Sequence, residues 1–234
     1  MKKWIFLFLV LTLLSGCQSS KQPQLMARIP SSKQKMAKVK PFLQKQELIV
    51  IDAGHGGEDR GTCSLIPPKY QEKSLNLATA QCLREFLQKM GYQVRMTRSD
   101  DTFIPLPMRS LFANNYNPRL FVSVHYNAAP SEFAEGVEVY YYNSDENKKR
   151  TSHSKKLADL VLQRIIQKTG AKSRGVKHGN LAVIRETMMP AILVEGGFMT
   201  NKEEMEKIKN PVYMKQLSLG IALGIDDYIK TGSY

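Results

Sequence analysis

Short apolar runs alternate with amphipathic stretches along most of this sequence. Runs typical of strands occupy residues 48–53, 93–97, 120–125, 136–142, 181–184 and 191–195. Apolar positions with helical spacing occupy residues 74–90, 107–116, 151–168 and 211–229. Ser74 can cap the first of these helices and Gly91 end it, and Gly170 can end the third. The alternation predicts a single α/β domain with a mostly parallel, twisted sheet and helices on both faces.

The first residues have the pattern of an export signal. Two lysines precede an apolar stretch over residues 4–14 that is too short to span a bilayer comfortably. A short membrane helix is the alternative reading. The sequence Leu-Ser-Gly-Cys at residues 14–17 resembles the signal of bacterial lipoproteins, in which the cysteine is lipidated and becomes the first mature residue. The resemblance implies a signal peptide over residues 1–16, export to the periplasm and a lipid anchor on Cys17.

Positive charge is concentrated after this cysteine. The net charge of the chain is +13, but residues 47–234 hold 25 basic and 21 acidic side chains. Residues 17–46 have no acidic residue and few large apolar ones, so they predict a flexible basic tether attracted to anionic headgroups. A plain spacer is the alternative. Phe42 is the only aromatic residue in the tether, so base stacking has little to use and nucleic acid is not an expected partner.

The tether leaves residues 47–234 for one folded domain, and two cysteines fall within it. Cys82 lies on the apolar stripe of the first predicted helix, which favours a buried thiol. A bridge to Cys63 is possible in an oxidising compartment, but the spacing cannot show it. Gln18, beside the lipidation site, resembles signals that send lipoproteins to the outer membrane rather than the inner one.

Three predicted strands end in groups that can bind a metal ion or carry a proton. The run at 48–53 leads to His55 between glycines, the run at 120–125 ends at His125, and the run at 191–195 ends at Glu195. In open α/β sheets, ligands bind beyond the carboxyl ends of the strands. Glu72, just before the first predicted helix, is a fourth candidate. We therefore expect these residues at one active site.

Two neutral imidazoles and a carboxylate form a common catalytic zinc site, in which one zinc ion makes hydroxide available at neutral pH. The two carboxylates then need different roles. Glu72 as a ligand stays ionised, whereas Glu195 can take a proton from the attacking water and pass it to a leaving group. A salt bridge or helix cap is the structural alternative for Glu195.

The motifs along residues 47–230 resemble the zinc-dependent N-acetylmuramoyl-L-alanine amidases of bacterial cell-wall remodelling. The matching stretches are "IVIDAGHGGEDRGT", "EKSLNLATA", "VRMTRSDDTFIPLPMRSLFAN", "LFVSVHYNAA", "GVEVYYY", "RGVKHGNLAVIRETMMPAILVEGGFMTN" and "SLGIALGIDDYI". The resemblance implies hydrolysis of the amide between N-acetylmuramic acid and L-alanine in peptidoglycan. It also implies zinc ligation by His55, Glu72 and His125, and catalysis by Glu195.

The resemblance has further implications for substrate and control. Asn127 and Arg174 are the candidate substrate-binding residues. Ala53 and Gly196 depart from residues usual in the family, and neither is a ligand; Glu58 is close enough to compete with Glu72 for the ligand role. Some relatives insert a blocking helix after the "GVEVYYY" strand, but only residues 143–150 stand there in this chain. We expect a monomeric enzyme that needs no obligatory activator.

Two other functions compete with this interpretation. The first is a lipoprotein that binds peptidoglycan without cutting it, which the complete set of four candidate residues disfavours. The second is an additional penicillin-sensitive serine carboxypeptidase activity on the stem peptide. Ser152 and Lys155 have the spacing of a Ser-x-x-Lys motif near a predicted helix start. Such short motifs often arise by chance.

Overall fold

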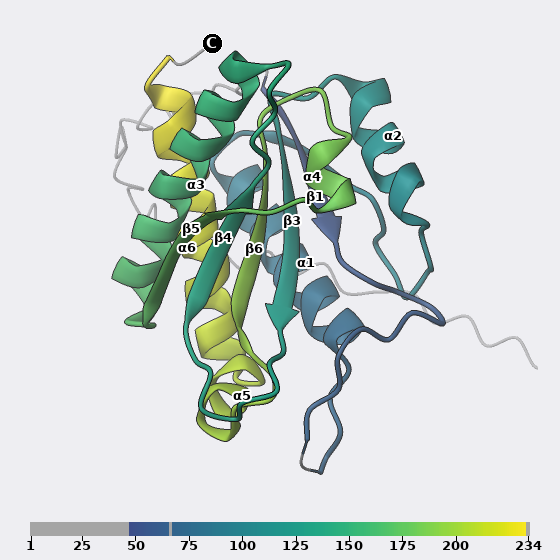
Figure 1. Ribbon diagram of the computed structural model, residues 1–234, viewed down its shortest axis with the longest axis vertical. Coiled ribbons are helices and arrows are strands. Elements are labelled where there is room, and N and C mark those ends of the chain that lie inside the picture. Colours follow the sequence, from purple (N-terminus) through teal and green to yellow (C-terminus); the bar gives the residue numbers. More distant parts are fainter. Residues whose placement is uncertain (1–46, 66, 233–234) are drawn as a thin grey trace, which may run out of the picture. The chain divides into compact units, whose positions relative to one another are not determined.

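One six-stranded sheet organises the part of the chain that the computed structural model describes, residues 47–65 and 67–232. Its strands are β1 (Leu48–Ala53), β2 (Gln93–Met96), β3 (Leu120–Asn127), β4 (Val137–Tyr141), β5 (Ser173–His178) and β6 (Ala191–Phe198). They lie in the order β2-β1-β3-β6-β4-β5 (Figure 1). Neighbouring strands are parallel except β4 and β6. The predicted mostly parallel sheet is confirmed, whereas the predicted signal peptide, the tether and Cys17 lie outside the described residues.

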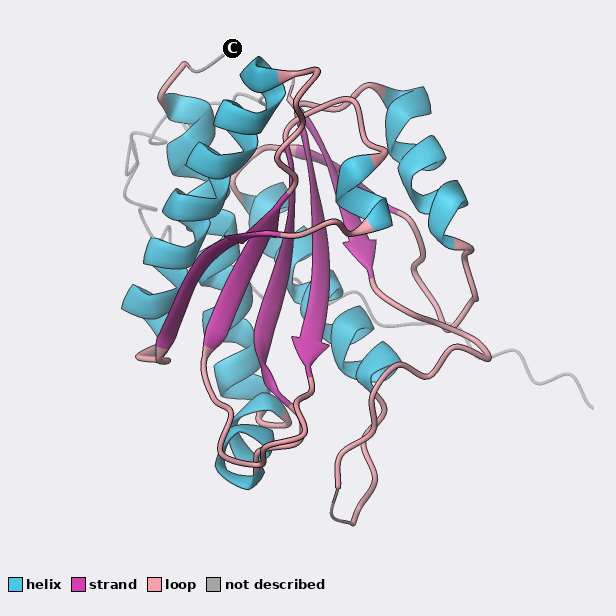
Figure 2. Cartoon of the chain, viewed as in Figure 1, coloured by secondary structure: helices cyan, strands magenta, loops and turns pink. Residues whose placement is uncertain are grey.

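Helices cover both faces of this sheet, as predicted (Figure 2). The long helices α1 (Glu72–Lys89), α3 (Lys148–Thr169) and α6 (Pro211–Lys230) pack on one face and share the larger core with it. On the other face, α2 (Leu106–Tyr116) and the short α4 (Ala182–Arg185) contribute to a smaller core. The helix α5 (Lys202–Ile208) follows β6. The second face is therefore the less completely covered one.

The alternation of side chains along β3 explains which residues reach this second face. Val122 and Val124 belong to the larger core, and Phe121 belongs to the smaller one. Because successive side chains of a strand point to opposite faces, Ser123 and His125 share the face of Phe121. The carboxyl end of β3 thus presents a histidine on the face that α2 and α4 only partly cover.

Two helix ends agree with the sequence prediction, and one does not. Gly170 caps the end of α3 in a left-handed conformation with φ of 66°, and Gly91 follows the last residue of the α1 cap with φ of 93°. The prediction that Ser74 caps α1 is wrong, because Gln71 is the N-cap and the helix begins at Glu72. The earlier start places Glu72 in the first turn of the helix, where its carboxylate lies 3.1 Å from His55, two residues past the end of β1.

Three other elements differ from the prediction. The apolar run at 181–184 is not a strand; Ala182–Arg185 form the helix α4, which buries Val183 and Ile184 against the smaller core. A short apolar run cannot distinguish a strand from a turn of helix by periodicity. The edge strand β5 was not predicted because its residues are mostly polar and partly exposed. The short helix α5 was also missed.

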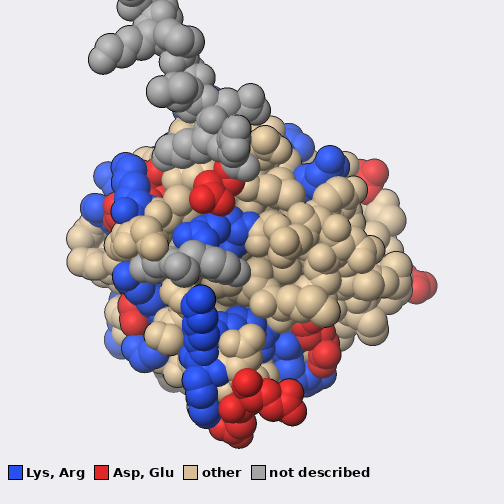
Figure 3. Space-filling model, turned by 90° about the horizontal axis from the view of Figure 1, so that it is seen from above, with Lys and Arg blue, Asp and Glu red and all other residues tan. Residues whose placement is uncertain are grey.

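The surface of the described residues mixes charges of both signs. In the view of Figure 3, basic and acidic side chains lie next to one another beside a large uncharged area. Cys63 and Cys82 are unpaired and half-buried, and Cys82 packs against the larger core, short of the full burial expected. Within residues 47–65 and 67–232, no helix combines the length and apolar character needed to cross a membrane.

Candidate metal centre and active site

The segment after β1 turns sharply to present His55. Its backbone has φ of 58°, a left-handed conformation that is uncommon for residues other than glycine and that often marks functional sites. Two buried arginines hold the backbone in this turn. Arg109 donates to the carbonyls of Ala53 and His55 at 2.7 and 2.8 Å, and Arg98 donates to those of Ala53 and Gly54 at 2.9 and 2.7 Å. The turn is therefore fixed by side chains from outside it.

A buried ion pair anchors Arg109 beneath this turn. Its guanidinium lies 2.9 Å from Asp52, which also accepts hydrogen bonds from Thr97 and Ser123, each at 2.7 Å. Burial alone would raise the pKa of Asp52, but the charge of Arg109 and the two hydroxyls lower it overall. Asp52 is therefore an ionised carboxylate that has three partners, and it fixes the arginine that positions His55.

His55, Glu72 and His125 meet at the carboxyl ends of β1 and β3. One possible ligand atom from each of the three lies within 4.8 Å of the other two. The Nε2 of His55 is 3.1 Å from Glu72 Oε2, and the Nδ1 of His125 is 2.9 Å from Glu72 Oε1. The two imidazole rings meet edge to face with centroids 4.9 Å apart. Residues separated by 70 positions in the chain are thus brought to one point.

Glu72 is the buried member of this group. Only 3% of the residue is exposed, and its carboxylate also accepts hydrogen bonds from the backbone of Thr62 at 2.9 Å and the side chain of Asn76 at 3.1 Å. Burial alone would raise the pKa of Glu72, but hydrogen bonds from His125 and His55 lower it strongly overall. The carboxylate is therefore ionised. Gly61 packs so closely that an added Cβ would lie 2.5 Å from Glu72 Oε2.

Asp59 fixes the orientation of the His55 ring. His55 Nδ1 lies 2.8 Å from Asp59 Oδ2, and a carboxylate can only accept in this pair, so Nδ1 carries a proton and Nε2 faces Glu72. Burial alone would lower the pKa of His55, but hydrogen bonds to Glu72 and Asp59 raise it overall. A carboxylate that binds the second nitrogen of a histidine is the usual partner of a metal-ligating imidazole.

Glu195 lies beside the group but outside it. It is in register with His125 on the neighbouring strand, so both side chains leave the same face of the sheet. Its Oε2 is buried and has no hydrogen-bond partner among the described residues. The pKa of Glu195 lies well above its usual range because of burial, with repulsion from Glu72 and Glu138 adding to the effect. A carboxyl group in this state is suited to proton transfer.

A cleft of about 230 Å³ opens beside the two histidines. Its other walls are largely apolar and come from the start of α2, from β6 and from α4, through Leu106, Leu193 and Leu181. A larger depression of about 550 Å³ lies elsewhere, between the end of β4 and the residues that follow α4, and contains none of the candidate site residues. The smaller cleft is therefore the candidate substrate site, because His55 and His125 line it.

The remaining predicted site residues lie at different distances from this centre. Asn127 ends β3, two residues past His125, and its side chain accepts from the backbone of Ala128 at 2.8 Å. Arg174 lies on the edge strand β5 and pairs with Glu138, which is in register with Glu195. Neither residue belongs to the group formed by His55, Glu72 and His125.

Ser152 and Lys155 lie in the first turns of α3, on its exposed surface. Lys155 donates to Asp159 at 2.9 Å, and this hydrogen bond raises the pKa of Lys155. A lysine that activates a serine needs a lowered pKa, because only the neutral amine accepts a proton. The local environment of Lys155 therefore works against a serine nucleophile.

Comparison with known proteins identifies the family of this chain and agrees with its fold. Residues 49–227 match the N-acetylmuramoyl-L-alanine amidase family Amidase_3, and the chain belongs to this family. It is 36% identical over 181 residues to a probable cell wall amidase, LytH of Staphylococcus aureus, which covers 77% of this chain. The chain spans 57% of that relative's length.

Two solved structures extend the comparison. An N-acetylmuramoyl-L-alanine amidase from Clostridium difficile 630 superposes with a TM-score of 0.74 at 39% identity, covering 80% of this chain and 98% of its own. The CwlD amidase from Clostridioides difficile, solved in complex with the GerS lipoprotein, superposes with a TM-score of 0.73 at 26% identity, covering 80% of this chain and all of its own. The α/β architecture is therefore that of cell-wall amidases.

Proposed function

We propose that this protein hydrolyses the amide between N-acetylmuramic acid and L-alanine in peptidoglycan, with one zinc ion held by His55, Glu72 and His125. The observation that carries the proposal is the convergence of two imidazoles on one buried, ionised carboxylate, with the buried, unpartnered Oε2 of Glu195 on the next strand. Membership of the amidase family supports the bond that is cut.

The residues fit a zinc ion by the chemistry of their donor atoms. Two imidazole nitrogens and a carboxylate oxygen are the ligands of many catalytic zinc sites, and the Asp59 carboxylate leaves His55 Nε2 available for the metal. When bound, zinc would lower the pKa of water and polarise the substrate carbonyl. The carboxylate of Glu72 would compensate the charge of the ion in a buried position.

Glu195 would carry the proton. As a base it would take a proton from the attacking water, and as an acid it would deliver that proton to the nitrogen of L-alanine as the amide breaks. A raised pKa favours the second step because it keeps the protonated form accessible near neutral pH. Because Glu195 Oε2 has no hydrogen-bond partner among the described residues, this oxygen can gain or lose a proton without breaking a structural contact.

We further propose that the protein is exported and held in the periplasm by a lipid on Cys17, at the outer membrane rather than the inner one. The sequence around Cys17 supports this location. The membrane, through this anchor, and peptidoglycan would then be its two partners, and the enzyme would act as a monomer.

Activity without a partner is the experiment that tests this function. CwlD was solved with the GerS lipoprotein. In this chain only residues 142–147 lie between the end of β4 and the start of α3, so this connection is too short to hold an inserted helix. The purified, zinc-loaded domain of residues 47–234 should release soluble fragments from isolated peptidoglycan by itself. An inert domain that a second protein switches on would contradict the open site, and an inert domain under all conditions would contradict the function.

Covalent labelling separates the amidase from the additional serine activity. A serine nucleophile would be acylated by a β-lactam, whereas hydrolysis by activated water forms no adduct. We expect labelled penicillin to leave no covalent mark, because Lys155 is paired with Asp159 and held protonated. Mass spectrometry of the intact protein measures this. A stoichiometric adduct that disappears in Ser152→Ala would establish the second activity.

A further inference from the structure

Two cations converge on one buried carboxylate beside Glu195. Glu138 is 2% exposed, and its Oε1 accepts from Lys177 at 2.9 Å and from Arg174, while its Oε2 accepts from Tyr140. The Arg174 guanidinium also stacks over the ring of Phe198, with its central carbon 4.9 Å from the ring centroid. One cation would be enough to neutralise Glu138. The cluster of Glu138, Arg174 and Lys177 therefore carries one surplus positive charge.

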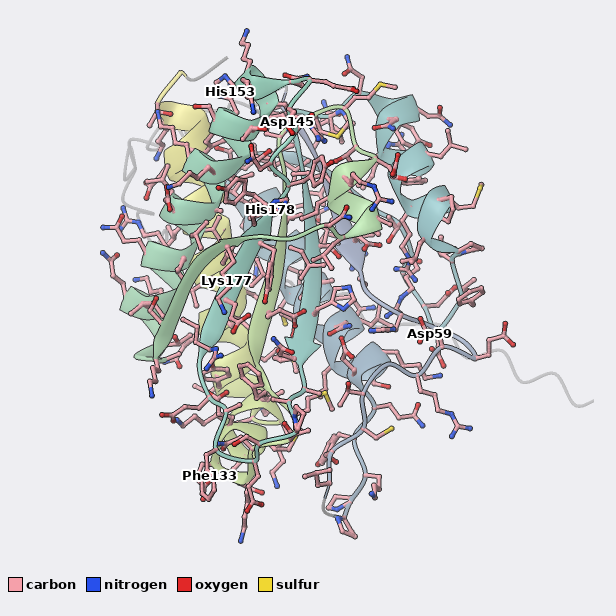
Figure 4. All side chains as sticks on the ribbon, viewed as in Figure 1. Asp59, Phe133, Asp145, His153, Lys177 and His178 are labelled. Carbon is pink, nitrogen blue, oxygen red and sulfur yellow. The ribbon has the colours of Figure 1, made fainter. Side chains whose placement is uncertain are left out.

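This surplus charge is exposed to solvent on the face of the sheet that also holds His125 and Glu195. The side chains of Arg174 and Lys177 are 36% and 38% exposed, so each has N–H groups available beyond those used by Glu138. No second carboxylate among the described residues pairs with Lys177. Lys177 lies on the β5 side of the sheet in Figure 4, and Asp59 of the metal centre lies on the other, with the ends of β3 and β6 between them.

The strand register places this cluster in line with the reacting atoms. His125 is in register with Glu195, and Glu195 is in register with Glu138, so the metal ligand, the proton carrier and the cluster form one row across the sheet. Neighbouring strands are about 4.8 Å apart, and one extended peptide residue spans about 3.5 Å. Glu138, where the two cations meet, is one strand spacing from Glu195 and two from His125, which corresponds to about one to three residues along a bound peptide.

We propose that Arg174 and Lys177 form a subsite for a carboxylate of the substrate, the free carboxylate of the glutamyl residue that follows L-alanine in the stem peptide. This inference rests on the proposed amidase function and names the part of the substrate that the β5 side of the site recognises. The surplus charge attracts the anion, the stacking on Phe198 fixes the plane of the guanidinium, and the open face admits the peptide. None of Glu138, Arg174 and Lys177 lines the apolar cleft by α2 and α4.

A pair of soluble muramoyl peptides tests the subsite. One carries the free carboxylate on its second residue, and in the other this group is amidated. The zinc-loaded protein should prefer the carboxylate form by about tenfold in kcat/KM, mainly through KM, as for a charge-assisted hydrogen bond that is partly exposed. Lys177→Met should remove most of this preference while leaving kcat/KM for the amidated form nearly unchanged, and Lys177→Arg should restore it.

The two lysine variants differ in whether they change the cluster of Glu138, Arg174 and Lys177. Lys177→Met leaves Arg174 to neutralise Glu138, so the buried carboxylate keeps a counter-ion. Lys172→Met is the matched control. Lys172 is the residue just before β5 and pairs with Glu135, outside the cluster of Glu138, Arg174 and Lys177, so its loss should leave the preference intact. Equal cleavage of the two peptides by the wild-type protein, or an equal loss for both in Lys177→Met, would overturn the subsite.

Calorimetric titration of the free stem peptides distinguishes this inference from the amidase function. The carboxylate peptide should bind about tenfold more tightly than the amidated one, and the difference should vanish in Lys177→Met. Carboxylate-dependent binding in a protein that cleaves neither muramoyl peptide would support the subsite and contradict the proposed reaction. Equal affinity for the carboxylate and amidated stem peptides, in a protein that cleaves both muramoyl peptides, would contradict the subsite alone.

Discussion

We expect a strong chelator to abolish the hydrolysis of peptidoglycan by this protein, and added Zn²⁺ to restore it. The reason is the group formed by His55, Glu72 and His125, which holds a carboxylate and two imidazoles within ligand distance of one point. When bound, the ion would lower the pKa of the attacking water and polarise the amide carbonyl, and a chelator would remove both effects. Metal content, measured by mass spectrometry on the same samples, should follow activity with about one zinc ion per chain.

The control for this experiment is the fold of the metal-free protein. The two cores on either side of the sheet do not include the ligands, so removal of zinc should leave the circular dichroism spectrum nearly unchanged. Loss of activity with the fold retained would assign the effect to the metal. Full activity in a protein shown to contain no metal would exclude the proposed chemistry.

Replacing Glu195 by glutamine should lower the rate by about 10²- to 10⁴-fold, the usual contribution of a positioned acid–base group. Glutamine has nearly the same size and keeps hydrogen-bonding capacity, but it cannot take a proton from water. Because the variant removes a repulsive, partly buried carboxyl group with an unpartnered oxygen, its stability should not fall. Single-turnover rates on a soluble muramoyl peptide would measure the chemical step directly.

Zinc content separates the roles of the two carboxylates. Glu195→Gln should bind zinc as the wild-type protein does, because Glu195 lies outside the metal-binding group, whereas Glu72→Gln should lose most of its zinc. The opposite pattern would mean that the two roles have been exchanged. Full activity in the Glu195→Gln protein would show that another group carries the proton.

The sequence predicted the site better than it predicted the edge of the sheet. Histidines and a glutamate after apolar runs marked the carboxyl ends of β1, β3 and β6, and parallel strands bring such ends together. The strand β5 lacks this signal. Its alternation is interrupted by Gly175 and by cations, because an edge strand beside a charged cluster does not need an apolar face. Lys177 was not a candidate for the same reason, because no apolar run precedes it.

Residues that position the ligands could not be found from the sequence. Asp59 has a weak signal, since it lies four residues after His55 in the same loop, but Arg109 comes from a helix 54 positions away. Its role depends on the burial of Asp52 and on the left-handed turn at His55, which are properties of the folded chain. These groups come together because the Arg109 side chain reaches from α2 to Asp52 and to the turn that follows β1.

Identification of the bond that is cut tests the central claim most directly. Isolated peptidoglycan is incubated with the zinc-loaded protein, and the products are separated and sequenced by mass spectrometry. The account predicts free stem peptides with a new amino group on L-alanine, together with glycan chains whose muramic acid residues carry a free lactyl carboxylate. Both products should form at least about 100-fold more slowly with Glu195→Gln at matched zinc content. Cleavage at any other bond, or no new L-alanine amino group with a protein that contains zinc, would contradict it.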